Sequence, residues 1–184
     1  MAALVIAEHD NISLKSATLH TIRAAIEISV FSDGLVDVLV AGHGASSVAE
    51  SATDIKGVGQ VLYADAPSLA PGSAESVAAQ VLAVSPGYSH ILFPGTLNGK
   101  RAAPHVAASL GVAHFSDVTG VVCADTFELP ADGGHAIATG QCDDAIKVLT
   151  VQTTGFDAAE GSGGFGAITF IPAASGAKSG AGVR

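Results

Sequence analysis

The chain has 184 residues, which fits one domain of ordinary size with a tail, and 48% of them are hydrophobic, so a sizeable core can form. Only 14% of the residues are charged and the net charge is -9, so electrostatic repulsion excludes nucleic acid as an expected partner. The two cysteines, Cys123 and Cys142, match no C-x-x-C spacing, and this usage is typical of a reduced cytosolic protein rather than of a disulfide framework.

The chain begins MAALVIAEHD and runs directly into a strand-like apolar segment. It lacks the basic start and the longer apolar run of a signal peptide. No apolar run approaches the roughly 18 residues that cross a bilayer. We therefore expect a soluble protein of the bacterial cytoplasm that does not insert into a membrane, or one of the mitochondrial matrix if the source is eukaryotic and the chain is processed.

Short apolar runs alternate with helical periodicity along the first part of the chain. The pattern predicts strands at 3–7, 36–42, 60–65 and 90–95, and each of them is followed by a predicted helix. The first helix covers 16–30, and the second is short, with Ser46 or Ser47 as its N-cap. The third covers 73–84, with Ser73 three residues before Ser76, and the fourth carries Ala103, Val106, Ala107 and Leu110. Four such βα units predict an α/β fold of three layers, in which a mostly parallel sheet has helices on both faces.

The pattern changes after residue 112. Residues 116–127 have strand character, but no helical periodicity follows them. Residues 135–141 and 145–155 are predicted as strands joined by the turn CDDA, and they would add a hairpin-like C-terminal strand pair to the fold.

Composition divides the chain near residue 156. Residues 1–156 carry the alternating pattern and are predicted to form the α/β scaffold domain. Residues 157–184 are rich in Gly, Ala and Ser, which indicates a linker or tail in which only 168–172 has the character of a short strand.

Residues 90–111, HILFPGTLNGKRAAPHVAASLG, have the layout of a phosphate cradle: a strand, a glycine loop, a lysine and a helix. A Walker A loop requires four residues between its glycines and a hydroxyl residue after its lysine. Here Gly95 and Gly99 enclose three residues, and arginine follows Lys100, so this is not a P-loop. A phosphate at the helix N-terminus remains physically possible. The simpler interpretation is a tight βα loop in which Asn98 and Gly99 form the turn.

The segment GHGASS (42–47) partly matches a dinucleotide-binding motif, but it follows the second strand, and Ser47 stands where the third glycine belongs. A short loop with a hydroxyl cap is the simpler interpretation. If the chain does bind a nucleotide, the candidate contacts are Gly42, Gly44, Ser46, Thr96, Gly99 and Lys100.

Glu8, His9 and Asp10 end the first predicted strand, at the carboxyl edge where open α/β sheets bind their ligands. Three consecutive polar side chains cannot all point at one metal ion, and no second cluster has ligand spacing, so we expect no metal site. The sequence also lacks a G-x-S-x-G elbow. From the residues alone, no catalytic constellation emerges.

Several segments occur in a specific order: LVIAEHDNISLKSATLHTIRAA, VLVAGHGASSVAESATDIKGVGQVLYADAP, YSHILFPGTLNGKRAAPHVAASLGVAHFSDVTGVV, DTFELP and VQTTGFDAA. Together they resemble the N-terminal domain of the electron transfer flavoprotein alpha subunit, from residue 3 to about residue 160. The resemblance implies a nucleotide-hydrolase-like α/β scaffold, without catalytic residues or a bound cofactor of its own. It also implies a heterodimer with a beta subunit that holds AMP, while the C-terminal domain of the alpha subunit holds FAD.

The same resemblance implies a role in electron transport. Family members carry electrons from acyl-CoA and related dehydrogenases of fatty acid β-oxidation to a membrane quinone oxidoreductase. Two alternatives remain open from the residues: a nucleotide-binding module of the universal-stress or ATP-pyrophosphatase type, which would hold AMP or ATP, and a free-standing interaction domain.

The chain departs from the family pattern in two respects. It stops at Arg184, before the flavin-binding segment of the family, so no FAD contact is transferred to it. His105, Leu129 and Gln152 also stand where the family usually carries arginine. If those arginines contact a partner or a neighbouring domain, their loss removes bidentate donors, and we expect weaker pairing with a beta subunit.

Overall fold

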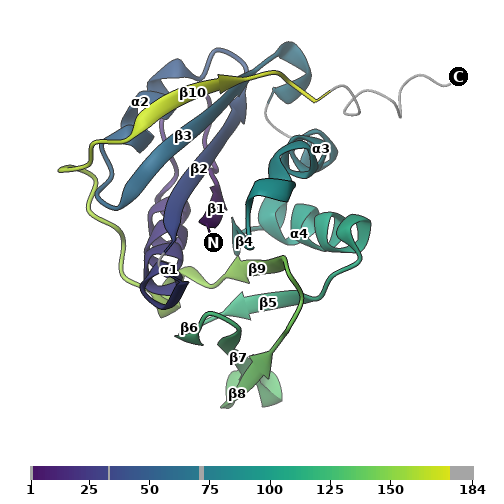
Figure 1. Ribbon diagram of the computed structural model, residues 1–184. Coiled ribbons are helices and arrows are strands. Elements are labelled where there is room, and N and C mark those ends of the chain that lie inside the picture. The colour runs from purple at the N-terminus through teal and green to yellow at the C-terminus, as the bar shows by residue number, and fades with distance from the viewer. Residues whose placement is uncertain (1, 33, 71–72, 175–184) are drawn as a thin grey trace, which may run out of the picture.

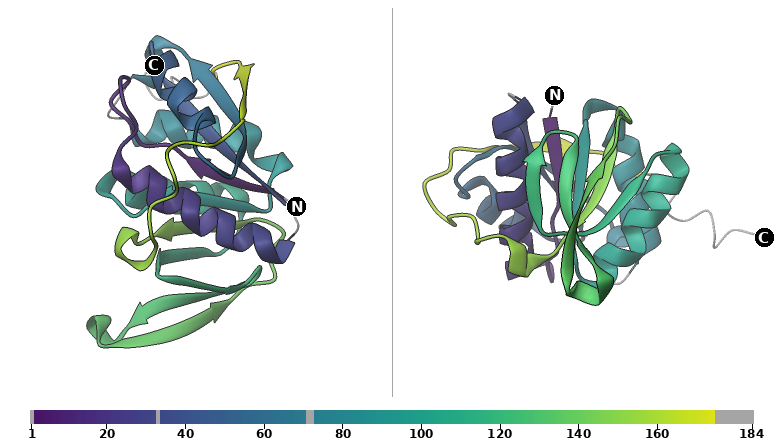
Figure 2. Two further views of the ribbon diagram at one scale, coloured as in Figure 1. Left: turned by 90° about the vertical axis from the view of Figure 1, so that its left-hand side faces the viewer. Right: turned by 90° about the horizontal axis from the view of Figure 1, so that it is seen from below.

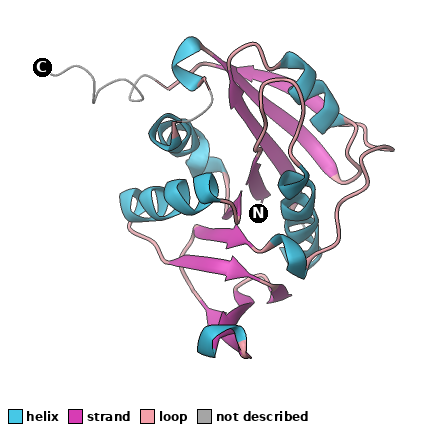
Figure 3. Ribbon diagram, turned by 180° about the vertical axis from the view of Figure 1, so that it is seen from behind, coloured by secondary structure: helices cyan, strands magenta, loops and turns pink. Residues whose placement is uncertain are grey.

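The computed structural model describes residues 2–32, 34–70 and 73–174. A parallel sheet lies between two pairs of helices, and a small antiparallel sheet stands beside it (Figures 1 and 3). The predicted three-layer α/β fold is confirmed.

The elements follow one another with short connections. The parallel sheet has seven strands, β1 (Ala2–Ile6), β2 (Leu35–Gly42), β3 (Val58–Asp65), β4 (His90–Pro94), β5 (His114–Val118), β9 (Lys147–Val151) and β10 (Ala167–Ile171), in the spatial order β10-β3-β2-β1-β4-β9-β5. The antiparallel sheet has the order β6-β7-β8 and contains β6 (Gly120–Cys123), β7 (Thr126–Ala131) and β8 (Ala136–Gln141). The α-helices are α1 (Ser16–Ser32), α2 (Ser46–Thr53), α3 (Ala74–Val84) and α4 (Leu97–Leu110), and the short 3-10 turns are η1 (Pro67–Leu69), η2 (Ser85–Gly87), η3 (Asp132–Gly134) and η4 (Thr153–Gly155).

The core has two halves, one on each face of the parallel sheet. Val5 and Val38 belong to the half under α1 and α2, whereas Leu4 and Leu39 belong to the half under α3 and α4, and all four are fully buried. Successive residues of a strand point to opposite faces, so burial on both sides requires continuous apolar runs. This is why the strands read as unbroken apolar segments in the sequence.

Two helix starts follow threonine or serine caps. The hydroxyl of Ser73 accepts a hydrogen bond from the Ser76 N–H (3.1 Å), which agrees with the spacing of these serines. Helix α4 begins directly after Thr96, whose hydroxyl accepts from the Gly99 N–H. The predicted turn at Asn98 and Gly99 is therefore wrong, because the cap lets the helix start at Leu97 and places both residues in its first turn.

The start of α2 differs from the prediction. Its N-cap is Ala45, which has no side-chain cap, rather than Ser46 or Ser47. The hydroxyl of Tyr63 accepts the Ala45 N–H instead (2.9 Å), and the Ser47 hydroxyl donates to the backbone oxygen of Ile12 (3.0 Å). A tertiary contact thus replaces the local cap.

The two strands predicted as a C-terminal pair do not form a hairpin. Strand β8 pairs antiparallel with β7 in the small sheet, whereas β9 inserts between β4 and β5 and runs parallel to both. Their burial explains the separation, because every residue of β9 is buried and nearly every residue of β8 is exposed. Figure 2 shows the small sheet projecting from one end of the parallel sheet.

The described part of the segment 157–184 runs back along the domain (Figure 1). The Ala159 N–H donates to the Leu19 oxygen (3.0 Å), and the Gly164 N–H donates to the Asp54 oxygen (2.9 Å). The chain then forms β10 beside β3, so the apolar run near its end is a strand, as predicted. The remainder of the predicted tail lies outside the described residues. Among the helices that the structure describes, none is both long and apolar enough to cross a membrane.

Candidate functional site

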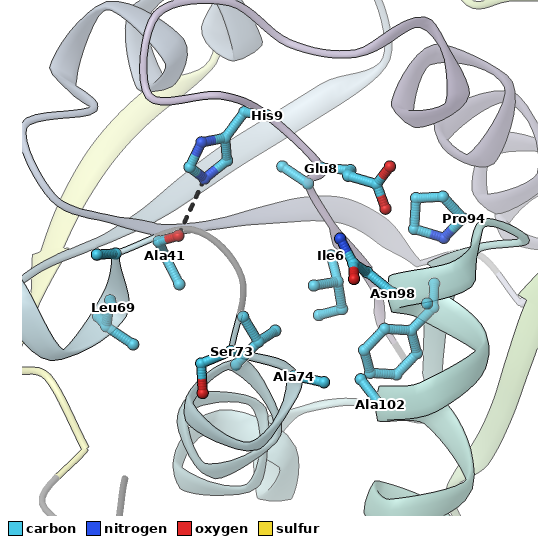
Figure 4. Close-up of a pocket in the computed structure, with 15 residues that line it drawn as sticks. Ile6, Glu8, His9, Ala41, Leu69, Ser73, Ala74, Pro94, Asn98 and Ala102 are labelled. Carbon is cyan, nitrogen blue, oxygen red and sulfur yellow. Dashed lines mark hydrogen bonds between the residues drawn. The ribbon is translucent and has the colours of Figure 1, made fainter. Parts of the chain in front are cut away.

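The strand order places a crevice between the carboxyl ends of β1 and β4. Strands β2 and β3 lie on one side of β1, and β4 lies on its other side. The connection that follows β1 and the connection that follows β4 therefore run in opposite directions across the sheet. In open α/β sheets ligands bind at such a switch point. A cavity of about 90 Å³ lies here, between the starts of α3 and α4 (Figure 4). Its walls are mainly apolar, and its polar side chains are Glu8, His9, Ser73 and Asn98.

Glu8 is held in place through its backbone. Its N–H donates to the hydroxyl oxygen of Thr18 (2.8 Å), and its carbonyl oxygen accepts from the same hydroxyl (3.1 Å) and from the Lys15 N–H (2.8 Å). Thr18 is fully buried. The Glu8 carboxylate accepts a hydrogen bond from the Thr96 hydroxyl, and Figure 4 shows this carboxylate directed towards Pro94 and Asn98. The side chain therefore occupies a defined position beside the first turn of α4.

His9 closes the other side of the crevice. Its Nε2 donates to the Ala41 oxygen (2.9 Å, dashed in Figure 4), and its Nδ1 accepts from the Asn11 N–H (3.0 Å). This pairing selects the neutral tautomer, and burial lowers the pKa of the ring below 6.5. Both nitrogens already have backbone partners, so His9 joins the loop after β1 to β2 rather than presenting a base or a metal ligand.

Gly42 belongs to this loop packing. A Cβ at Gly42 would lie 2.7 Å from Asn11 Oδ1 and 2.8 Å from His9 Cε1, so only glycine lets the loop approach the end of β2. The Gly44 N–H donates to Asp65 Oδ1 (2.9 Å). The glycines that resemble a dinucleotide motif are thus used by contacts within the chain.

Gly99 serves the packing of α4 against β4. A Cβ at this position would overlap the carbonyl oxygen of Pro94, and the neighbouring backbone leaves no room for it. Lys100, the residue that suggested a phosphate site, lies 3.1 Å from Asp117 Oδ1 and forms an ion pair there. Both residues of the G-K pair therefore have structural partners.

The structure does not gather the six candidate nucleotide contacts around the cavity. Gly99 lines it, whereas Thr96 and Lys100 lie beside it with the partners described above, and Gly42, Gly44 and Ser46 belong to the end of β2 and the start of α2. Of Glu8, His9 and Asp10, the first two line the cavity, and Asp10 caps its own loop through the N–H groups of Ile12 and Ser13.

Sequence reasoning missed Ser73 and Asn98 as residues of the crevice, and Thr18 as the residue that holds Glu8. Serine or threonine just before a predicted helix is a signal for the caps Ser73 and Thr96. Nothing local signals Thr18, because its contact with Glu8 joins positions ten residues apart. Within the described residues, no three His, Cys, Asp or Glu side chains gather into a metal-binding group.

The three positions that depart from the family pattern lie on different elements. His105 is exposed on α4, and Leu129 is partly buried on β7 against the core. Gln152 follows β9, where its side-chain amide donates to the Thr154 hydroxyl (3.0 Å). No hydrogen bond or ion pair joins any two of the three in the described part of the chain.

Comparison with known proteins gives a consistent result. Residues 3–181 match the family model described as the electron transfer flavoprotein domain. The chain is 47% identical over 168 residues to the electron transfer flavoprotein subunit alpha of Pseudomonas aeruginosa, which covers 91% of this chain and 53% of that protein. It is 41% identical to the mitochondrial subunit alpha of Dictyostelium discoideum, over 88% of this chain and 46% of that protein. The corresponding subunit of Paracoccus denitrificans is 40% identical, over 95% of this chain and 55% of that protein.

The chain therefore spans about half the length of the curated relatives that it matches. The family model covers nearly all of the described residues, including both sheets and the crevice. On this match, the chain belongs to the electron transfer flavoprotein family.

Proposed function

We propose that the chain is the N-terminal scaffold domain of an electron transfer flavoprotein alpha subunit, with no catalytic residues and no bound nucleotide of its own. The observation that carries this proposal is the match over residues 3–181, together with relatives that are named alpha subunits at 40–47% identity. The crevice supports the scaffold role, because Glu8, His9 and Ser73 are hydrogen-bonded within the chain and Gly99 is needed for the packing of α4.

The crevice between β1 and β4 does not fit a flavin adenine dinucleotide. The cavity of about 90 Å³ is far smaller than the ~300–1,000 Å³ typical of sites for drug-sized ligands. FAD would supply the one-electron chemistry in the domain that the relatives have beyond this match, and AMP would lie in the beta subunit. This chain would then contribute shape and contact surfaces to the complex.

The partner that follows from the proposal is an electron transfer flavoprotein beta subunit, in a heterodimer. Electrons would reach the complete complex from acyl-CoA-type dehydrogenases of fatty acid β-oxidation and leave it to a quinone oxidoreductase. The bacterial cytoplasm is the expected setting, with the mitochondrial matrix as the alternative, in keeping with bacterial and mitochondrial relatives. His105, Leu129 and Gln152 are proposed to lie at partner or domain contacts.

Co-purification tests the proposal. A tagged beta subunit is mixed with the 184-residue chain, and the complex is measured by size exclusion and calorimetry. We expect a one-to-one complex in which the chain contributes no flavin absorbance. Failure of the folded chain to associate with any beta subunit tried would favour the free-standing interaction domain. Saturable AMP or ATP binding by the chain alone would favour the nucleotide-binding module.

Arginine restoration tests the three departing positions. His105→Arg, Leu129→Arg and Gln152→Arg are introduced singly, and the affinity for the beta subunit is compared with that of the unaltered chain. We expect at least one of them to strengthen the association, because arginine supplies a bidentate donor. An unaltered affinity in all three folded variants would remove these positions from the proposed interface.

A further inference from the structure

We propose that Glu8 sets the charge selectivity of the crevice: its carboxylate stands where an anion would approach the start of α4, and it excludes phosphate groups from the cavity. This inference rests on the proposed function, since it explains how a fold with a ligand-type crevice remains free of nucleotide. Three features of the described residues support it: the position of Glu8, the lack of an ion-pair partner for its carboxylate, and the small size of the cavity.

The position of Glu8 is set by contacts of its backbone and by a hydrogen bond to its carboxylate. Thr18 and Lys15 hold the backbone of Glu8, so substitution of its side chain leaves these anchors in place. The Gly99 N–H donates to Thr96 Oγ1 (3.3 Å), and the Thr96 hydroxyl in turn donates to the Glu8 carboxylate. The positive end of α4 is therefore already paired, through Thr96, with a negative group of the chain itself.

Glu8 belongs to no ion pair among the described residues. In the described part of the chain the ion pairs are His43 with Asp65 and Lys100 with Asp117, and neither includes Glu8. The nearest titratable ring, His9, is neutral in the pairing described above. An entering anion would meet one full negative charge at short range. At about 5 Å and an effective dielectric of ~20, such a charge weakens anion binding on the order of a hundredfold.

The cavity defines the probe that can report this effect. About 90 Å³ leaves room for a small oxyanion and not for a nucleoside. Inorganic phosphate is therefore the appropriate ligand for the crevice, and AMP is the ligand that tests the proposed function.

Glu8→Gln is the matched substitution, because it removes the charge and keeps an oxygen that can accept from Thr96. The full 184-residue chain, labelled with ¹⁵N, is titrated with inorganic phosphate at constant ionic strength. The backbone amide signals of Asn98, Gly99 and Lys100 are followed. We expect saturable shifts at these amides in Glu8→Gln, with affinity at least about tenfold above that of the unaltered chain. Glu8→Ala, which also enlarges the cavity, should show the same gain.

Glu50→Gln is the control, because it makes the same charge change at an exposed position on α2. It should bind phosphate no better than the unaltered chain. Folded Glu8→Gln and Glu8→Ala proteins without saturable shifts would overturn the role of Glu8 and leave the proposed function standing. An equal gain in Glu50→Gln would also overturn it, because the effect would then come from net charge. Saturable binding of AMP to the unaltered chain would instead contradict the proposed function.

Discussion

Tyr88 donates a 2.6 Å hydrogen bond to Oδ2 of Asp37 and so ties the segment after α3 to the interior of β2. Asp37 is only 7% exposed, and its Oδ1 is a buried oxygen without a hydrogen-bond partner among the described residues. Burial raises the pKa of the Asp37 carboxyl above 3.8, and it also raises the pKa of the Tyr88 hydroxyl. The hydrogen bond therefore joins the segment between α3 and β4 to β2. It lies near the amino ends of the strands, at the edge of the sheet opposite the crevice.

Tyr88→Phe should destabilise the domain. It removes the hydroxyl that pairs with a buried carboxyl, and an unsatisfied buried group costs about 1–3 kcal/mol. Urea unfolding followed by circular dichroism measures the change in free energy of unfolding. In the Asp37→Asn background the same substitution should cost less, because no charged oxygen is then left unpaired. Equal costs in both backgrounds would show that the hydrogen bond does not carry the effect.

Asp37→Asn should change the pH dependence of stability. Because the folded-state pKa of Asp37 is raised, its contribution to stability is fully present below pH 3.8 and is lost as the pH rises through the folded pKa. The variant lacks this loss, so its free energy of unfolding relative to the unaltered chain should increase from pH 4 to pH 7. A buried asparagine amide adds an offset that is the same at every pH, so the slope is the quantity to measure. A flat difference across this range would contradict the prediction.

The buried histidines should destabilise the domain in mild acid. Burial lowers the pKa of His9 and of His90 below 6.5, so the folded state takes up these protons less readily than the unfolded chain. Their contribution to stability is present above pH 6.5 and is lost as the pH falls through the folded values. NMR titration of the ring signals should give midpoints below 6.5 for both residues. Midpoints at or above 6.5 would refute the assignment.

Gly99→Ala should be strongly destabilising, by about 3 kcal/mol or more, because the added methyl group overlaps the Pro94 carbonyl and forces α4 away from β4. Gly87→Ala is the matched control, since nothing lies within 4 Å of a Cβ built there. Thermal and urea unfolding of both variants measures the difference. Comparable stability of the two variants would mean that α4 can shift at little cost.

Lys100→Met should change stability by less than about 1 kcal/mol, because its ion pair with Asp117 is partly exposed and screened by solvent. Asp117→Asn should have a similarly small effect, and asparagine tolerates the positive φ of 57° at this position. Urea unfolding of the two single variants and the double variant gives the coupling energy. A loss of several kcal/mol would assign Lys100 a role beyond this pair.

The sequence was sufficient to predict the four βα units, because strands buried on both faces and helices with one apolar face have different periods. It was not sufficient to predict where β9 lies in the sheet. Strand β9 pairs with β4 and β5, and its apolar residues do not indicate which strands will be its neighbours. The crevice shows a similar limit. A glycine that lets backbone approach a phosphate and one that lets a helix approach a strand are identical in sequence, and only the Pro94 carbonyl beside Gly99 distinguishes them.

The insertion of β9 has a consequence for how the chain assembles. Among the described strands, β5 pairs only with β9, so the side of the sheet beyond β4 cannot close until the chain has been synthesised through Val151. Until then β4 presents an open, apolar edge, which is a template for pairing with another chain. Contacts between such distant segments also slow folding. Between the synthesis of β4 and the docking of β9, this edge is therefore open to pairing with another chain.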